Sequence, residues 1–164
     1  MTQTPMTQTP KTQTPEPQIL VDADACPVKP EIYRVARRHG LEVKLVANSW
    51  MRTPLHGGIE LVVVGDGLDV ADDWIAERAT ARDVVVTSDI PLAARCLDQG
   101  AQVLAPNGRV FTEEGIGDAL ATREVLSQLR DVGIATGGPP AFGKQDRSRF
   151  LQSLEEAIRR SRRG

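Results

Sequence analysis

The sequence of residues 19–24 is Ile-Leu-Val-Asp-Ala-Asp, a short apolar run that ends in two carboxylates. Apolar runs at 61–64 and 84–86 are also followed by acidic residues, Asp66 and Asp89, and residues 103–104 form a weaker apolar run. In a parallel α/β sheet the carboxyl ends of all strands meet at one edge, and ligands bind there. Carboxylates that converge at such an edge repel one another unless a cation neutralises them, and hard oxygen ligands suit Mg²⁺ or Mn²⁺. The pattern therefore predicts a parallel α/β domain with a divalent-metal site.

The composition fits one domain built on aliphatic side chains. Apolar residues make up 40% of the 164 residues, but aromatic residues make up only 4%. A core of Val, Leu, Ile and Ala is typical of a parallel sheet that is buried on both faces. The formal net charge of −2 argues against a globally basic nucleic-acid-binding protein, although it does not exclude a local basic patch.

Residues 1–17 differ from the rest of the chain. The pentapeptide Met-Thr-Gln-Thr-Pro occurs at 1–5 and 6–10, and Lys-Thr-Gln-Thr-Pro follows at 11–15. A segment without apolar periodicity cannot bury enough surface to offset its ordering entropy. We predict a disordered tail over 1–17 and a single α/β domain over 18–164.

The expected compartment is the cytoplasm. Cys26 and Cys96 do not form a disulfide framework, no apolar signal segment opens the chain, and no apolar run is long enough to span a membrane. No membrane partner is therefore expected, and the sequence leaves the oligomeric state open.

From residue 18 onward, strand patterns alternate with helix patterns, which indicates βαβ units and a parallel sheet. Strands are predicted at 18–23, 41–47, 59–64, 83–87 and 102–105, and helices at 28–39, 69–81, 90–99, 113–131 and 146–162. The last two helices have no strand between them. We expect both to pack on one face of the sheet or to lie across the crevice.

Two candidate ligands lie after the first strand. Asp22 and Asp24 are two residues apart, so both side chains would face the same side of an extended chain and could bind one cation. Alternatively, Asp24 caps the following helix. Asp89 has the same two possibilities, as a metal ligand at a strand end or as the N-cap of the third helix.

A third acidic group opens the second helix. Asp69, Asp72 and Asp73 have i, i+3 and i+4 spacing, so they share one helix face. The helix dipole alone would favour one or two acidic residues there, but three on one face repel each other. Asp66, between two glycines, is predicted to be a turn residue.

Two familiar templates of phosphate chemistry fit poorly. A haloacid-dehalogenase-type phosphatase would need its acidic pair after the Thr87-Ser88 strand end, whereas the acidic group precedes it. A dinucleotide-binding fold would need a Gly-rich turn after the first strand, and none is present. A nucleophilic role for Cys26 has no local histidine to support it.

Several motifs together resemble the YaiI/YqxD family of bacterial proteins, over about residues 19–160. These motifs are Ile19–Lys29, Val46–Asn48, Asp69–Ile75, Val86–Ala93, Gly137-Gly138-Pro139 and Asp146-Arg147. The family is grouped with PIN-like domains, whose characterised members are metal-dependent nucleases. The resemblance implies a PIN-like three-layer fold with two extra C-terminal helices.

The resemblance also implies roles for individual residues. Asp22 is similar to the first PIN carboxylate, Asp72 to the acid in the helix before the fourth strand, and Asp89 to the acid after that strand. Asp24, Asp69 and Asp73 would be additional or alternative metal ligands. The Cys26-Pro27 turn and the segments at 137–139 and 146–147 depart from ordinary PIN nucleases.

We therefore expect a metal-dependent phosphodiesterase that acts on RNA or DNA. Its catalytic carboxylates would be Asp22, Asp24, Asp72 and Asp89, which would hold Mg²⁺ or Mn²⁺. Phosphate contacts are expected from Lys29, Asn48 and Arg147 at the rim of the crevice. The alternatives are a non-catalytic module that binds nucleic acid or nucleotides, and a small-molecule phosphatase.

Overall fold

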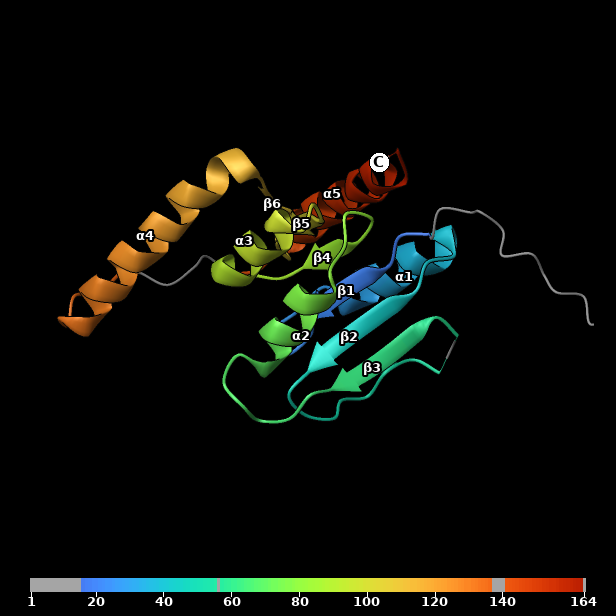
Figure 1. The fold of residues 1–164 in the computed structure, drawn as a ribbon, viewed down its shortest axis with the longest axis horizontal. Coiled ribbons are helices and arrows are strands. Elements are labelled where there is room, and N and C mark those ends of the chain that lie inside the picture. The colour runs from blue at the N-terminus through green and yellow to red at the C-terminus, as the bar shows by residue number, and fades with distance from the viewer. Residues whose placement is uncertain (1–15, 56, 137–140, 164) are drawn as a thin grey trace, which may run out of the picture.

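The structure is a computed structural model, and it describes residues 16–55, 57–136 and 141–163. A sheet of six strands forms its centre (Figure 1). The strands are β1 (Ile19–Asp22), β2 (Val43–Ala47), β3 (Ile59–Val63), β4 (Val84–Val86), β5 (Gln102–Leu104) and β6 (Val110–Phe111). The helices of the described residues are α1 (Lys29–His39), α2 (Val70–Arg78), α3 (Ile90–Asp98), α4 (Glu113–Asp131) and α5 (Lys144–Arg163).

The sheet has the strand order β3-β2-β1-β4-β5-β6. The first five strands in this order are parallel, and β6 is antiparallel to β5. The carboxyl ends of β1 to β5 therefore lie at one edge of the sheet. We call this the carboxyl edge.

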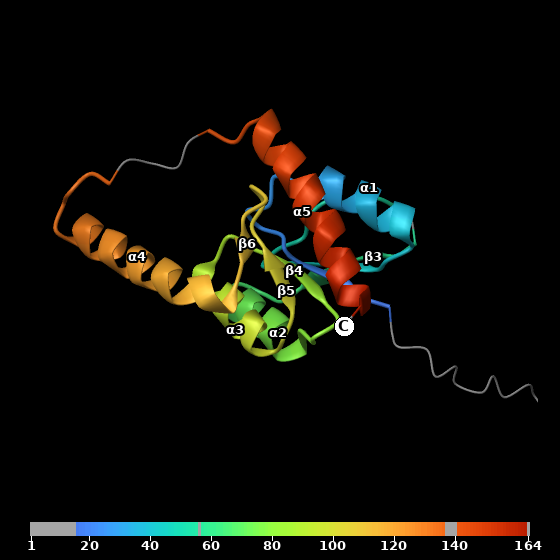
Figure 2. The same cartoon turned by 90° about the horizontal axis from the view of Figure 1, so that it is seen from above.

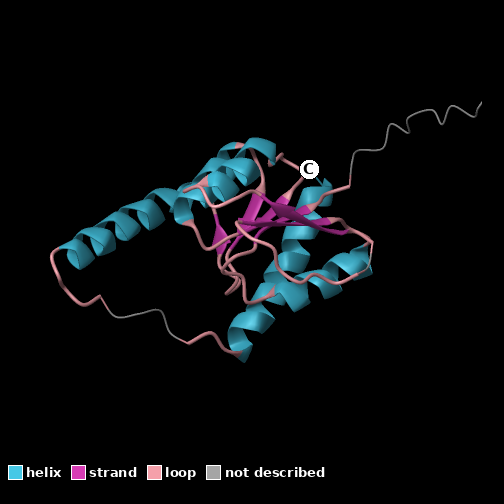
Figure 3. Ribbon diagram, turned by 90° about the horizontal axis from the view of Figure 1, so that it is seen from below, coloured by secondary structure: helices cyan, strands magenta, loops and turns pink. Residues whose placement is uncertain are grey.

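Helices cover both faces of the sheet, so the domain has three layers (Figure 3). Helices α1 and α5 lie side by side on one face, and α2 and α3 cover the other (Figure 2). This arrangement buries strand side chains on both sides. Ile19 and Val21 point into the core beneath α1 and α5, whereas Leu20 between them belongs to the core beneath α2 and α3.

The last helix supplies a complete apolar stripe to the first of these cores. Phe150, Leu154, Ala157 and Ile158 are all buried, at the i, i+4, i+7 and i+8 spacing of one helix face. The fold class predicted from the sequence, a three-layer α/β domain with a mostly parallel sheet, is confirmed.

The structure corrects the expectation for the last two helices. They do not share a face: α4 contacts α3, whereas α5 packs on α1, β4 and β5. Most of α4 extends away from the sheet, and Ala119 is its only buried residue (Figures 1 and 2). The sequence pattern also missed β6, because two residues are too few to show a strand period.

Helix ends follow the predicted signals. Gly40 ends α1 in the left-handed conformation, with φ of 67°, which a glycine adopts without a steric cost. The side chains of Asp89 and Thr112 cap α3 and α4, because they accept hydrogen bonds from the amides of Leu92 and Gly115.

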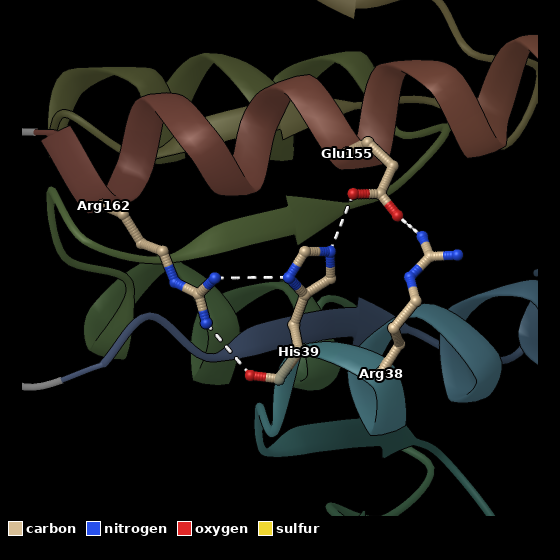
Figure 4. A network of polar contacts seen from close by, with 4 residues as sticks. All are labelled: Arg38, His39, Glu155 and Arg162. Atoms are coloured by element: carbon tan, nitrogen blue, oxygen red, sulfur yellow. Dashed lines mark hydrogen bonds and ion pairs between the residues drawn. The ribbon is translucent and has the colours of Figure 1, made fainter.

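A polar network joins the two helices on the first face (Figure 4). His39 Nε2 lies 2.7 Å from Glu155 Oε2, and Arg162 donates to the carbonyl oxygen of His39 at 3.0 Å. Arg38 also forms a salt bridge with Glu155. The network fixes the end of α1 against the second half of α5.

None of the helices in the described residues is both long enough and apolar enough to cross a membrane. Residues 1–15, which carry most of the predicted tail, lie outside the described residues, so the boundary at residue 17 stays a prediction.

Candidate functional site

The centre of the candidate site lies between the carboxyl ends of β1 and β4. Asp22 is the last residue of β1, and Thr87 directly follows β4. The buried Thr87 hydroxyl donates a hydrogen bond to Asp22 Oδ2 at 2.9 Å and accepts one from the Asp89 amide at 3.0 Å. One side chain thus holds both Asp22 and the backbone of Asp89 in place.

Of the two roles that the sequence left open for Asp89, the structure shows the N-cap, and the role as a metal ligand stays a prediction. Its Oδ1 accepts a hydrogen bond from the Leu92 amide at 2.9 Å, so it is the N-cap of α3. Its charge also raises the pKa of both Asp22 and Asp72, and its amide donates to the same Thr87 hydroxyl that donates to Asp22. A capping role therefore does not remove Asp89 from the site.

Asp24 is fixed by the loop after β2. The Asn48 amide donates to Asp24 Oδ2 at 3.0 Å, and the Asn48 side chain donates to the Gly65 carbonyl at 2.8 Å. Asn48 therefore ties the loops after β1, β2 and β3 together. This contact gives Asn48 a positioning role at the rim of the site.

The three aspartates at the start of α2 differ in their surroundings. Asp69 has a left-handed backbone with φ of 63°, unusual for a residue other than glycine, and its side chain makes no capping hydrogen bond. Asp72 lines the same cleft as Asp22 and Asp24. Asp73 forms a salt bridge with Arg95 of α3 at 2.7 Å, so it is engaged in helix packing instead.

A cleft of about 300 Å³ lies over these side chains. The acidic residues that line it are Asp22, Asp24, Asp66, Asp69 and Asp72. None of the described residues that line it is basic. Asp66, expected to be a turn residue, is both exposed in the loop before α2 and part of this lining.

The carboxylates affect one another's protonation. Burial, together with the charges of Asp89, Asp22, Asp69 and Asp73, raises the pKa of Asp72 to about 6. Burial also raises the pKa of Asp22; the Thr87 hydrogen bond opposes this rise, and the Asp89 and Asp24 charges reinforce it. Among the described residues that line the cleft, therefore, negative groups lie together with no basic side chain to balance them.

The donor set suits a hard divalent cation, because it consists of carboxylate oxygens. Over the described ranges, however, no three or more His, Cys, Asp or Glu side chains form a ready-made metal cluster. The carboxylates come from separate segments: Asp22 ends β1, Asp72 lies in the first turn of α2, and Asp89 follows β4. They fit an ion that also keeps water or substrate ligands, and they do not fit a closed all-protein cage.

Two expected phosphate contacts are engaged elsewhere. Lys29 donates to the Cys26 carbonyl at 3.0 Å. Arg147 forms a salt bridge with the buried Glu31 at 2.6 Å and also donates to the Pro27 carbonyl at 2.9 Å. Arg147 therefore joins α5 to the start of α1, and a phosphate contact from it stays a prediction. Of the two C-terminal motifs, Gly137-Gly138-Pro139 lies outside the described residues.

The role of Thr87 was not predicted from the sequence. Thr87 lies within the motif Val86–Ala93, but no function was expected of it. The available signal was its position: a hydroxyl directly after a run of three valines is set in a buried strand end, where a polar side chain needs partners.

Similarity to known proteins identifies the family of this chain. A family model described as "Uncharacterized BCR, YaiI/YqxD family" matches residues 20–160. A UPF0178 protein of Sphingopyxis alaskensis is 61% identical over 149 residues, which cover 90% of this chain and 97% of that protein. A UPF0178 protein of Nitrobacter winogradskyi is 57% identical over 146 residues, which cover 89% of this chain and 93% of the relative. No solved structure matches the chain. The chain therefore belongs to the YaiI/YqxD family of bacterial proteins.

Proposed function

We propose that this protein is a metal-dependent phosphodiesterase that cleaves RNA or DNA. The observation that carries the proposal is that Asp22 and Asp72, from separate segments, line one cleft without basic residues in its described lining, and that the charge of Asp89 acts on both. Charges of one sign are rarely gathered in this way unless a ligand balances them. The resemblance to PIN-like nucleases supports the same class of reaction.

A Mg²⁺ or Mn²⁺ ion is the ligand that this donor set favours. Mg²⁺ keeps several of its waters and binds through one or two carboxylates together with substrate phosphates. Such an ion does not need three protein ligands in contact before substrate arrives. The absence of a ready-made cluster among the described residues is compatible with this mode of binding.

The carboxylates of the site would have different roles in binding the ion. Asp22 and Asp89 would hold the ion, Asp72 and Asp24 would complete or extend its coordination, and Asp69 would lie at its edge. Asp73 is already paired with Arg95, so its role as a ligand is the weakest of the six. When bound, the metal supplies a more acidic water and stabilises negative charge on phosphate oxygens.

Two positioning residues keep the carboxylates apart and oriented. Thr87 holds Asp22, and Asn48 holds Asp24 across the cleft. A carboxylate must be ionised to bind a cation, so metal affinity should rise with pH through about 6, the pKa of Asp72.

The direct test is hydrolysis of short single-stranded RNA and DNA in Mn²⁺, with wild type, Asp22→Asn and Asp98→Asn compared. Asp98 is an exposed carboxylate at the far end of α3, so its variant has the same change of charge outside the site. We expect cleavage by wild type and Asp98→Asn, and loss of at least about 100-fold in Asp22→Asn. Equal activity in wild type and Asp22→Asn would refute the catalytic proposal.

A thermal-shift measurement tests the metal site separately. Saturating Mn²⁺ at about 100 times its dissociation constant should stabilise wild type by roughly 2.7 kcal/mol, because it binds the folded state. Asp22→Asn should show little of this gain. The same shift in both proteins would mean that Mn²⁺ binds elsewhere.

A further inference from the structure

A second cleft lies between the start of α3, α4 and the turn that joins β5 to β6. Its volume is about 340 Å³, and Arg109, Arg123 and Arg130 all line it. Arg123 and Arg130 are seven residues apart on α4, which is two turns and therefore the same helix face. We call this cleft the arginine groove.

The charge of the arginine groove is largely unbalanced. Within the described ranges none of the three guanidinium groups has a carboxylate oxygen within salt-bridge distance. Arg109 lies over the ring of Phe111, 5.5 Å from its centre. Asp118 is the one acidic residue among the described residues that line the groove. Three free guanidinium groups in one cleft suit a ligand with several phosphate groups, because guanidinium binds phosphate oxygens in pairs.

The groove and the acidic site share the carboxyl edge of the sheet. Ile90, which lines the groove, directly follows Asp89, and Arg109 is in the turn after β5. A cleft whose charged lining residues are all carboxylates repels a polyanion. Positive side chains next to it would hold the neighbouring phosphates of the chain that is to be cut.

An exposed aromatic residue lies on the other side of the acidic site. Trp50 is 75% exposed in the loop between β2 and β3, two residues after Asn48. A tryptophan ring exposed to this degree gains little from the protein's own packing. Aromatic side chains in such positions stack on unpaired bases, independently of sequence.

We propose that the arginine groove binds the sugar–phosphate backbone of a single-stranded nucleic acid, and that Trp50 stacks on an unpaired base beyond the acidic cleft. This inference rests on the proposed function, and it adds the strandedness of the substrate and the path of the strand. Duplex nucleic acid has no free base for Trp50, so it should bind more weakly.

Binding is measured in EDTA, where metal-dependent hydrolysis does not interfere. The probes are fluorescent oligouridine and oligodeoxythymidine of about 12 nucleotides, within known single-strand site sizes, and a duplex of equal length. The variant Arg109→Ala/Arg123→Ala/Arg130→Ala is compared with Arg34→Ala/Arg37→Ala/Arg160→Ala. The second set removes the same charge at exposed positions on α1 and α5.

The salt dependence of binding distinguishes direct contacts with phosphate groups from a general effect of the protein's net charge. Each lost phosphate contact lowers the slope of log affinity against log salt by about 0.7 for single strands. We expect the groove variant to lose about 2 in slope and roughly tenfold or more in affinity, with little change in slope for the control set. If the groove variant does not fold, the double variant Arg123→Ala/Arg130→Ala, at exposed positions on α4, is used in its place. Its slope of log affinity against log salt should be about 1.4 lower than that of wild type.

Trp50 is tested with the same probes. Trp50→Ala should bind single strands roughly 5- to 150-fold more weakly, which corresponds to one stacked base, whereas Trp50→Phe should retain most of the affinity. Equal affinity of wild type and Trp50→Ala, or stronger binding of the duplex, would overturn the single-strand proposal. Tighter binding of oligouridine or of oligodeoxythymidine would identify RNA or DNA as the source of the backbone.

The two proposals fail in different ways. Arginine-dependent binding in EDTA without cleavage in Mn²⁺ would support the groove and refute the phosphodiesterase. Cleavage that depends on Asp22, together with equal binding and salt slopes in the two arginine variants, would refute the groove and leave the phosphodiesterase intact.

Discussion

The hydroxyl group of Thr87 holds two parts of the acidic site in place, the Asp22 side chain and the backbone of Asp89. It is 1% exposed, and it donates to Asp22 while accepting from the amide of Asp89. A buried polar group that loses its partner costs more free energy than the hydrogen bond itself contributes. The hydroxyl is therefore important for both stability and site geometry.

Replacing Thr87 by valine keeps the shape of the side chain and removes both hydrogen bonds. We expect Thr87→Val to lower the free energy of unfolding by about 1–3 kcal/mol, measured by urea denaturation. Thr87→Ser keeps the hydroxyl and should lose less. Equal losses in the two variants would show that the methyl group, and not the hydroxyl, is what matters.

Asp72 destabilises the folded protein at neutral pH. Its pKa is raised from 3.8 to about 6, so it releases its proton less readily in the folded than in the unfolded state. A group with a raised pKa contributes stability below its unfolded pKa and loses that contribution as pH rises through its folded pKa. The ionised carboxylate therefore costs stability above about pH 6.

We predict that Asp72→Asn melts at a higher temperature than wild type at about pH 8 in EDTA. Asp72 is only partly buried, so screening should limit the gain to about 1 kcal/mol, or roughly 2–4 °C. The gain should shrink as pH falls towards about 4, where Asp72 is neutral in both states. A gain that is independent of pH would exclude charge repulsion as its cause.

At the scale of elements, Arg147 joins the first turn of α5 to the first turn of α1. Glu31 is buried and pairs with a guanidinium that is 42% exposed. Removing one partner of a buried pair leaves an uncompensated charge, whereas replacing both partners by apolar residues is often neutral. Arg147→Met should therefore lower the free energy of unfolding by about 3 kcal/mol, and Glu31→Leu/Arg147→Met should recover most of this loss.

Chemical denaturation measures the free energy of unfolding of both variants. Equal values for the single and the double variant would contradict a structural role for the pair.

His39 makes the α1–α5 contact sensitive to acid. Burial lowers the pKa of His39, and the charges of Arg162, Arg38 and Arg159 lower it further, although Glu155 accepts a hydrogen bond from the ring. The unfolded chain therefore takes up a proton before the folded protein does, below about pH 6.5.

Stability from His39 should be complete above about pH 6.5 and should fall as pH falls below it. We expect the difference in melting temperature between wild type and His39→Gln to decrease from about pH 7.5 to pH 5.5. The carboxylates of the acidic site are the same in both proteins, so their opposite pH dependence cancels. If this difference in melting temperature grew on acidification, the hydrogen bond to Glu155 would be raising the pKa of His39 by more than burial and the arginines lower it.

The parallel part of the fold follows directly from the sequence pattern. Buried strands with apolar runs, Gly40 and the caps Asp89 and Thr112 are local signals, and each predicted element has its counterpart in the structure. The faces used by α4 and α5 could not be predicted, because two helices in succession can choose either side. Their choice depends on contacts with strands and helices distant in sequence.

The candidate site was predictable only in its residue types. Strand ends indicate which carboxylates share an edge, so the proximity of Asp22, Asp72 and Asp89 follows from topology. Side-chain partners do not follow from topology. The pairs Asp73–Arg95 and Arg147–Glu31 bridge separate helices, and no spacing along the chain indicates them.

At the scale of the whole molecule, the described residues form two apolar cores, one on each face of the sheet. The core beneath α1 depends on α5, in which Phe150 is fully buried. Phe150→Ala should lower the free energy of unfolding by about 3–5 kcal/mol, because it leaves a large cavity. Val125→Ala on α4, at a residue that is 54% exposed, should change it by less than about 0.5 kcal/mol. Urea denaturation would contradict the assignment of the core if the two variants were equally stable.

The pairing of α1 with α5 also bears on how the protein is made. Helix α1 is translated early, but the helix that covers the same face begins only at Lys144. A nascent chain on the ribosome therefore exposes the apolar side of its first strands until that late segment has emerged. Until then it presents a surface that chaperones bind and that other nascent chains can aggregate with.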